Sequence, residues 1–431
     1  MESLFIILLI SLYGFNFVCS QSPFLSSAGK ERICRKPIVE ITVSPLIKST
    51  LRELEVSWDV GDQWKAGDWI GLYKELPENG AKPLYKTEAG RSTGWVRTGI
   101  PEGRKFQEEP NFNKICLGFW TVYWRANSTN PVASSCLSSN PRWMEDSKKV
   151  IRNLKIREMF LPGTHDSGAF YLAYEPYEET RLNKYVFAQD ETILEQLIHG
   201  ARYLDFRIGY YKGTWWLNHG IFQVHPLEQV LEDVKEFMDK TKEIVVIDIH
   251  AFPAGFTKRD THYELIKYLR DELGSYVAPP WLSWNANLGQ LWDRNKRLIL
   301  SYNDRSLVAE NLDFLWSPVS QKWPDVRSVR ALYSFFNDVF KAYEVNGGRG
   351  PSLVWAAMAE LTPDAWGVII DKYRGLRNMA DMVNRNVTEW FRGDWGRMCN
   401  AVAVDFIRST GIVEAAIRWN IRKGTRSNCD P

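Results

Sequence analysis

The sequence predicts an α/β protein, a (β/α) TIM-type barrel preceded by a small all-β sandwich domain. Two observations predict this architecture. Residues 37–137 alternate apolar and polar residues with a period of two, which is typical of half-buried strands. Beyond residue 150, apolar residues recur at helical spacing between short apolar runs. Because 431 residues exceed one average domain, we expect three segments: a signal peptide (1–20), a β-sandwich domain (21–145) and a barrel domain (146–431).

The composition is that of an ordinary folded protein, with 45% hydrophobic and 25% charged residues. The 54 Lys and Arg nearly balance the 52 Asp and Glu, which gives a net charge of +2. No strongly basic field therefore indicates a nucleic-acid partner. The 19 Trp residues fit a thick core, a sugar-binding surface or a membrane-interface contact. The oligomeric state stays open.

The first 20 residues set the expected compartment. The apolar run LFIILLISLYGFNFV is short for a membrane-spanning helix. Val18 and Ser20 fit the small-residue rule for signal-peptide cleavage. The region before the apolar run contains Glu2 and no Lys or Arg, so an N-terminal anchor is the alternative. We expect a cleaved signal and a secreted, extracellular protein.

Secretion changes the interpretation of the cysteines. Cys19 would leave with the signal, and the five that remain lead us to expect disulfides, with one thiol free or paired elsewhere. Their irregular spacing does not indicate a zinc site, and it leaves the pairing open. Asn127 and Asn386 begin glycosylation sequons that a secreted chain could use. The remaining cysteines are Cys34, Cys116, Cys136, Cys399 and Cys429.

The sandwich is predicted from its strands. In LEVSWDV (54–60) apolar and polar residues alternate, and the runs 68–74 and 117–126 continue the theme. The run DWIGLYK (68–74) resembles the signature of SKICH-type β-sandwich domains. No residue set in this half indicates catalysis. The Ser-, Asn- and Pro-containing stretch 134–143 is expected to be the linker.

The barrel is predicted from alternating helices and strands. Apolar residues recur at helical spacing in 191–204 and 226–240. About 280 residues of this alternation favour a parallel sheet closed into a barrel, with an open doubly wound sheet as the alternative. The candidate strands are the short apolar runs 201–209, 243–252, 296–304 and 399–407.

Polar residues mark the carboxyl ends of these runs. If the strands line a barrel, such residues converge at its carboxyl-terminal mouth, where these barrels build active sites. His165 and His219 also follow strand-like runs and precede Gly-containing loops. Each residue has a structural alternative, such as a buried ion pair, but packing does not readily explain them all together. The strand-end residues are Asp205, Arg207, Asp248, His250 and Asp405.

Three separated motifs resemble the X-domain of phosphatidylinositol-specific phospholipases C. The likeness is closest to the metal-independent kind, which includes bacterial secreted enzymes and the PI-PLC X domain-containing proteins. It runs from about residue 150 to near the end, and VVIDIHAF and NAVAVDFI follow the three motifs in the expected order. The motifs are LPGTHDSGAF (161–170), QDETILEQLIHGARYLDFRIG (189–209) and LNHGIFQVHPLEQVLEDVKEF (217–237).

The resemblance implies a phosphoric diester hydrolase that acts on phosphatidylinositol-type lipids or GPI anchors. His165 would be the general base on the inositol 2-hydroxyl, and His219 the general acid on the departing diacylglycerol oxygen. Arg207 would stabilise the charge on phosphorus in place of a metal. Calcium-dependent relatives carry Asn after the first histidine and acidic ligands near the strand of Arg207. We therefore expect no metal and no other cofactor.

The resemblance also implies supporting roles. Asp205 would fix the guanidinium of Arg207, Asp166 would support the acid histidine, and Asp405 would orient the base histidine. Bacterial relatives carry Lys where this chain has His250, so we expect His250 to contact the headgroup in its own way.

Two other functions stay open at this point. One is a metal-dependent enzyme of the glycerophosphodiesterase or sphingomyelinase D type, although Arg207 stands where an acidic cluster is needed. The other is a non-catalytic barrel protein that binds lipids or glycans. Peripheral contact with a membrane is a further expectation for the partner of this chain.

Overall fold

The computed structural model describes residues 36–48, 51–78, 80–103, 111–171, 179–181, 183–345 and 354–427. These residues belong to one compact unit. The predicted signal peptide, Cys34 and Cys429 lie outside the described residues. Within the described ranges, no helix is both long enough and apolar enough to cross a bilayer.

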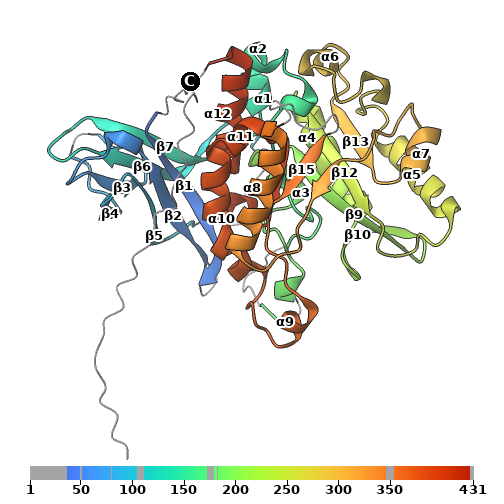
Figure 1. Ribbon diagram of the computed structural model, residues 1–431, viewed down its shortest axis with the longest axis horizontal. Helices are drawn as coiled ribbons and strands as arrows, with labels where there is room; N and C mark the ends of the chain where they lie inside the picture. Colours follow the sequence, from blue (N-terminus) through green and yellow to red (C-terminus); the bar gives the residue numbers. More distant parts are fainter. Residues whose placement is uncertain are drawn as a thin grey trace, which may run out of the picture. The chain divides into compact units, whose positions relative to one another are not determined.

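An all-β region opens the described chain (Figure 1). Its antiparallel strands form two sheets, ordered β1-β2-β5 and β4-β3-β6-β7. The alternation predicted at 54–60 is present, because Leu54, Val56 and Trp58 are buried in the core that both sheets share. The strands are β1 (Ile38–Lys48), β2 (Leu51–Asp59), β3 (Trp69–Tyr73), β4 (Tyr85–Glu88), β5 (Thr93–Pro101), β6 (Cys116–Trp124) and β7 (Pro131–Ser138), with a 3-10 turn η1 (Gly61–Gln63).

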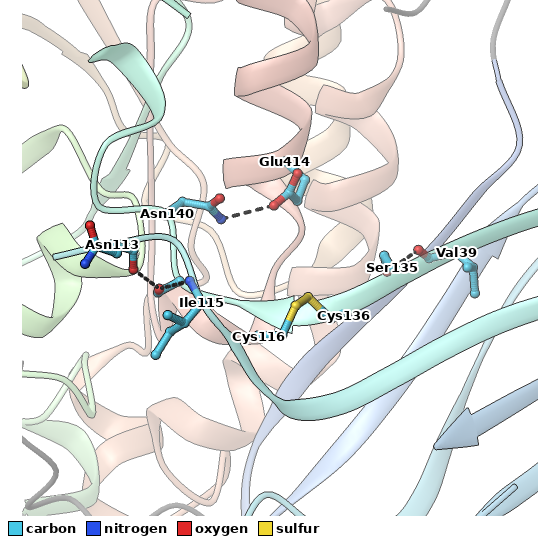
Figure 2. Close-up of a disulfide and its surroundings, with 9 residues drawn as sticks. Val39, Asn113, Ile115, Cys116, Ser135, Cys136, Asn140 and Glu414 are labelled. Carbon is cyan, nitrogen blue, oxygen red and sulfur yellow. Dashed lines mark hydrogen bonds between the residues drawn. A yellow bond between two sulfur atoms is a disulfide. The ribbon is translucent and has the colours of Figure 1, made fainter. Parts of the chain in front are cut away.

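The expected disulfide is present between Cys116 and Cys136 and joins β6 to β7 (Figure 2). The linker predicted over 134–143 is wrong in its first half, because residues up to Ser138 continue β7. A serine side chain of this strand also bonds to the other sheet: the hydroxyl of Ser135 donates to the carbonyl of Val39, 2.6 Å away (Figure 2). Cys399 is a buried thiol.

Parallel strands form the barrel that follows. β8 (Leu161–Thr164), the first of them along the chain, pairs on one side with β9 (Tyr203–Tyr211) and on the other with β16 (Ala401–Val404), the last. This pairing of first and last strands closes a barrel and rules out the open doubly wound sheet. A Cβ on Gly163 would lie 2.6 Å from the carbonyl oxygen of Tyr203, so glycine permits the close approach of β8 to β9.

The other barrel strands complete the circuit. β12 pairs with β9 and β13, and β14 pairs with β15, which pairs with β16. A bridge between Ser301 and Trp316 continues the ladder beyond β13. A hairpin extends the sheet outward from β9. These strands are β12 (Val245–Ala251), β13 (Leu298–Tyr302), β14 (Ser320–Lys322) and β15 (Trp355–Met358), and the hairpin strands are β10 (Thr214–His219) and β11 (Phe222–Pro226).

Helices with one apolar face cover the barrel. On the helix predicted at 226–240, Val230, Leu231 and Val234 are buried against the sheet while acidic neighbours face solvent. The helices are α1 (Trp143–Asp146), α2 (Lys148–Ile151), α3 (Ile193–Ile198), α4 (Leu227–Lys240), α5 (Arg259–Leu273), α6 (Leu288–Asp293), α7 (Arg305–Glu310), α8 (Val329–Val345), α9 (Ala365–Ile369), α10 (Leu376–Arg392), α11 (Trp395–Met398) and α12 (Ile412–Thr425). Short 3-10 turns are η2 (Ile156–Glu158), η3 (Asn183–Tyr185), η4 (Pro280–Leu282) and η5 (Ile407–Ser409).

The sandwich packs on the barrel through β1, which contacts α10 and η5 (Figure 1). The segment after β7 also reaches the barrel helices, because Asn140 donates to the carboxylate of Glu414 on α12 at 3.0 Å (Figure 2). Charged residues, described below, supply much of the remaining contact.

Candidate active site

The predicted residues meet at the carboxyl ends of the barrel strands. His165 directly follows β8, and Asp405 directly follows β16. Asp205 and Arg207 lie on β9, and His219 is the last residue of β10. Because parallel strands end at the same rim, the topology brings together residues up to 240 positions apart in the sequence.

The two histidine rings face each other across the mouth. The ring centroids of His165 and His219 are 6.5 Å apart, and the planes are nearly perpendicular at 89°. A phosphate with its two ester oxygens fits between two groups at this spacing. The geometry thus allows one imidazole to act on the attacking oxygen and the other on the leaving oxygen.

His165 is held from both sides. Its Nδ1 lies 2.7 Å from Oδ1 of Asp405, and its Nε2 lies 2.7 Å from Nη2 of Arg207. A guanidinium only donates, so Nε2 accepts and the Nδ1 proton goes to Asp405. This is a neutral imidazole in the tautomer that leaves Nε2 free to take a proton.

The charges around His165, in contrast, favour its protonated form. Burial lowers the pKa, but the nearby carboxylates of Glu360 and Asp405 outweigh burial and raise it to about 9. Such a pKa favours imidazolium at neutral pH, whereas the contact with Arg207 needs an unprotonated Nε2. We take the neutral form, because two N–H donors at 2.7 Å would repel. The pKa of Glu360 is itself raised to about 7, mainly by burial, so this carboxylate is only partly charged near neutral pH.

Arg207 lies between two carboxylates. Its Nη2 is 3.2 Å from Asp205 and its Nη1 is 3.4 Å from Asp166. Burial favours the neutral acid at Asp205, but the charge of Arg207 is stronger and lowers the pKa of Asp205 to about 2. Nε of Arg207 is buried without a hydrogen-bond partner. One N–H of this guanidinium is therefore left without an acceptor among the described residues.

His219 and Asp166 form the other side of the site. Nδ1 of His219 lies 2.5 Å from the carbonyl of Val186, which can only accept, so Nδ1 carries a proton. Nε2 of His219 then faces Oδ2 of Asp166 at 3.9 Å. Asp166 has a backbone φ of 39° in the left-handed region, which turns its carboxylate toward the mouth. Burial raises the pKa of Asp166 against the opposing charge of Arg207.

His250 lies at the rim rather than at the centre. Its Nδ1 is 3.8 Å from the carboxylate of Asp248, one of the buried groups beneath the mouth. Asp248 accepts hydrogen bonds from the hydroxyls of Tyr203 and Ser301, both at 2.7 Å. The half-buried imidazole of His250 thus lies beside a carboxylate that two hydroxyl groups hold in place.

Sequence reasoning missed Glu360. This residue is buried, its Oε1 lies 3.8 Å from Nε2 of His165, and neither carboxylate oxygen has a hydrogen-bond partner. The signal was available, because VWAAMAE (354–360) is an apolar run that ends in a carboxylate, as the other barrel strands do. Gln321, which donates to Asp205 at 3.1 Å, was also missed, and its three-residue strand β14 carries no readable pattern.

Among the residues that the structure describes, no group of three or more His, Cys, Asp or Glu side chains has the arrangement needed to hold a metal ion. Asp166 and Asp205 are paired with Arg207. Asp248 accepts from hydroxyl donors, whereas Glu360 has no hydrogen-bond partner.

No family model matches the chain. It is 25% identical over 313 residues to PI-PLC X domain-containing protein 1 from Homo sapiens, which covers 66% of this chain and 94% of that protein. It is 23% identical over 309 residues to PI-PLC X domain-containing protein 3 from Bos taurus, which covers 64% of this chain and 92% of that protein.

Solved structures show the same fold. A mutant phosphatidylinositol-specific phospholipase C from Staphylococcus aureus superposes with a TM-score of 0.50 at 15% identity, covering 64% of this chain and 96% of that one. A second structure of the S. aureus enzyme gives a TM-score of 0.51 at 15% identity, covering 65% and 97%. The chain is a homologue of the PI-PLC X domain-containing proteins, with the barrel fold of bacterial phosphatidylinositol-specific phospholipase C.

Proposed function

We propose that this chain is a phosphoric diester hydrolase that cleaves phosphatidylinositol-type lipids or GPI anchors without calcium. One observation carries the proposal: two histidine rings 6.5 Å apart flank a guanidinium that contacts one of them. Nε2 of His165 removes the proton of the inositol 2-hydroxyl, whose oxygen attacks phosphorus. Nε2 of His219 gives a proton to the diacylglycerol oxygen as the P–O bond breaks, leaving a cyclic inositol phosphate.

Arg207 supplies the charge in this mechanism. When phosphate enters, its oxygens compete with Nε2 of His165 for the guanidinium, so binding releases the base for proton transfer. The same N–H donors then stabilise the charge that develops on phosphorus. Asp405 stabilises the imidazolium that forms on His165, and Asp166 faces the acid, His219. This assignment gives Arg207 the role that calcium has elsewhere and makes EDTA a direct test.

The test uses the purified full chain with labelled phosphatidylinositol and a GPI-anchored reporter, both in EDTA. We expect turnover by the wild type and none by His165→Ala. His199→Ala is the matched control, since His199 follows the last residue of α3, has no part in the proposed mechanism and should leave turnover intact. Loss of wild-type turnover in EDTA would contradict the role of Arg207. Turnover by His165→Ala would contradict the base assignment, and binding without turnover would favour a non-catalytic lipid-binding protein.

Peripheral membrane contact is part of the proposal. Large apolar side chains are exposed where the chain leaves the strand ends: Ile221, two residues beyond His219, is 80% exposed, and Trp366 on α9 is 66% exposed. Such side chains can enter a lipid interface. We expect Ile221→Ser with Trp366→Ser to weaken binding to phosphatidylinositol vesicles. Leu312→Ser, an exposed apolar residue in a loop that leads into a strand, should not. Equal losses in both would contradict this surface.

Secretion is proposed on the N-terminal sequence alone. Of the two sequons, Asn127 is exposed in the turn between β6 and β7, whereas Asn386 is half-buried within α10. We therefore expect a glycan on Asn127 when the chain is expressed in a secretory host. Mass spectrometry of the secreted product tests both the cleavage and the glycan. A product that keeps its first 20 residues would contradict the cleavage, and an unmodified Asn127 would contradict the glycan.

A further inference from the structure

A buried ion cluster joins the sandwich to the barrel. Arg52 on β2 donates to Asp190 at 2.8 Å and to Glu191 at 3.0 Å, and lies 3.1 Å from Glu102. Three guanidinium groups face three carboxylates, so the formal charges cancel. We call this the interface ion cluster, and it consists of Arg52, Glu102, Asp190, Glu191, Arg377 and Arg408, all buried.

One barrel member of this cluster, Asp190, is linked to the loop of the candidate base through its neighbour in the sequence. Asp190 directly follows Gln189, whose side-chain amide donates to the backbone carbonyls of His165 at 3.0 Å and of Val404 at 2.8 Å. The amide oxygen of Gln189 accepts from the backbone N–H of Ile407. This one side chain therefore connects the loop after β8, which carries the base, with the loop after β16.

The loop after β16 is fastened by the same cluster. Asp405, which orients the base, is three residues before Arg408. Arg408 pairs with Glu102 of the sandwich and lies 3.5 Å from Glu191 of the barrel. The sandwich thus contacts the loop after β16 directly, through Glu102 and Arg408, and is linked to the loop after β8 through Asp190 and the neighbouring Gln189. These two loops carry His165 and Asp405, whose side chains are 2.7 Å apart.

The charges of the cluster make these contacts stiff. Burial lowers the pKa of Arg52, but Glu102, Asp190 and Glu191 together hold it well above its usual value. Removing one partner leaves an uncompensated buried charge, which must find water or another partner by moving the chain. A displacement of Asp190 would be passed to Gln189, because the two residues are adjacent in the chain.

We propose that Arg52, a residue of the sandwich, is a positioning residue for the hydrogen bond between His165 and Asp405. It acts through Asp190 and Glu191 and touches neither substrate nor reacting atoms. The inference rests on the proposed function for its kinetic readout only. By this proposal, the sandwich domain helps to position the candidate catalytic residues of the barrel.

The experiment uses the full chain and a matched pair of sandwich carboxylates. Glu102→Gln removes a charge from the interface ion cluster. Glu40→Gln removes an equally buried carboxylate that borders the end of the loop after β16 at Gly411. Its ion pairs, however, are with Arg392 on α10 and Arg418 on α12 rather than with the interface ion cluster. Arg52→Met is the direct variant and Arg52→Lys its rescue. If Arg52→Met does not fold, the matched glutamate pair still tests the proposal.

Two readouts are measured for each variant. One is kcat and KM on labelled phosphatidylinositol. The other is the far-downfield proton NMR resonance of the Nδ1–H of His165, identified by its loss in Asp405→Asn. We expect Arg52→Met and Glu102→Gln to lower kcat by about tenfold with little change in KM, and to shift or broaden the resonance. Arg52→Lys should restore part of both, and Glu40→Gln should leave both as in the wild type.

The outcomes separate this inference from the proposed function. An inactive wild type would overturn the proposed function, while the resonance would still report on positioning. An unchanged resonance in Arg52→Met and Glu102→Gln would overturn the positioning role. A resonance changed equally by Glu40→Gln would also overturn it, because the effect would then be general loosening of the interface.

Discussion

The interface ion cluster and the barrel mouth both bury charged side chains, but they treat the charges differently. In the cluster each charge has an opposite charge within 3.5 Å. Both regions contain buried polar atoms without a hydrogen bond, such as Oε2 of Glu191 in the cluster and Oδ2 of Asp166 at the mouth. Among the carboxylates described in these two regions, however, Glu360 alone has no hydrogen bond on either oxygen and no opposite charge closer than 3.8 Å. The cluster is therefore closed in its ion pairs, whereas the mouth contains a carboxylate that is open to a further partner.

The largest effect is expected at the mouth, where a substitution should lower the activity but leave the stability of the fold unchanged. His219→Asn keeps an N–H that can donate to the carbonyl of Val186 but removes the proton donor facing Asp166. We expect kcat on phosphatidylinositol to fall about 10³- to 10⁴-fold. The melting temperature should stay near that of the wild type, since the ring makes no close ion pair. An equal fall in melting temperature would place His219 among the structural charges.

The closed cluster should show the reverse, a large loss of stability. Asp190→Asn leaves Arg52 and Arg377 without their shared carboxylate, and we expect the free energy of unfolding at pH 7 to fall by about 4 kcal/mol. Burial disfavours the charged form of Asp190, but the two arginines lower its pKa to about 2. A lowered pKa stabilises the fold above pH 4, and this stabilisation is lost as the pH falls through 2.

Urea unfolding of wild type and Asp190→Asn between pH 7 and pH 2 measures this. The difference between the two proteins in free energy of unfolding should decrease below pH 4 and be smallest near pH 2. A difference that is independent of pH would mean that packing, rather than charge, accounts for the loss.

The charged form of Glu360 should destabilise the fold. Burial is the main cause that raises its pKa to about 7, above the 4.5 of a free glutamate, so the folded state holds its proton more tightly. The contribution of Glu360 to stability therefore falls as the pH rises from about 4.5 to 7. Glu360→Gln removes this loss, and we expect it to stabilise the protein at pH 8 by roughly 3 kcal/mol relative to its effect at pH 4.5.

Thermal melts of wild type and Glu360→Gln across this pH range provide the measurement. The difference in stability should grow up to about pH 7 and then level off. If Glu360→Gln is less stable than the wild type at pH 8, the carboxylate has a partner that keeps it charged. Glu360 would then resemble the paired charges of the interface ion cluster.

The mouth could be predicted from the sequence better than the cluster could, and the reason is physical. Strand ends carry a local signal, an apolar run followed by a polar residue, so His165, Arg207 and Asp405 were found without knowing their neighbours. Arg52 and Asp190 are 138 residues apart, and only folding makes them partners. Nothing local distinguishes Arg52 from a solvated arginine on a strand.

The two errors of detail differ in their cause. Glu360 has the same strand-end signal as Asp405, because β15 and β16 both have four residues, so no physical reason prevented its prediction. The Ser-rich segment at 134–138 has the composition of a linker, but it gains its strand from pairing with β6. Tertiary pairing overrode composition there.

The smallest effect is expected where the contact is as short but lies in solvent. Arg270 donates to Asp313 at 3.2 Å through Nη2, and Nη1 lies 2.5 Å from the other oxygen, so this geometry matches that of the interface ion cluster. The side chains are 39% and 69% exposed, however, and water screens them. We expect Asp313→Asn to cost less than about 1 kcal/mol, and less still in high salt. The same substitution at Asp190 and at Asp313 therefore compares burial at nearly constant geometry, and similar losses at both would mean that distance alone sets the energy of these pairs.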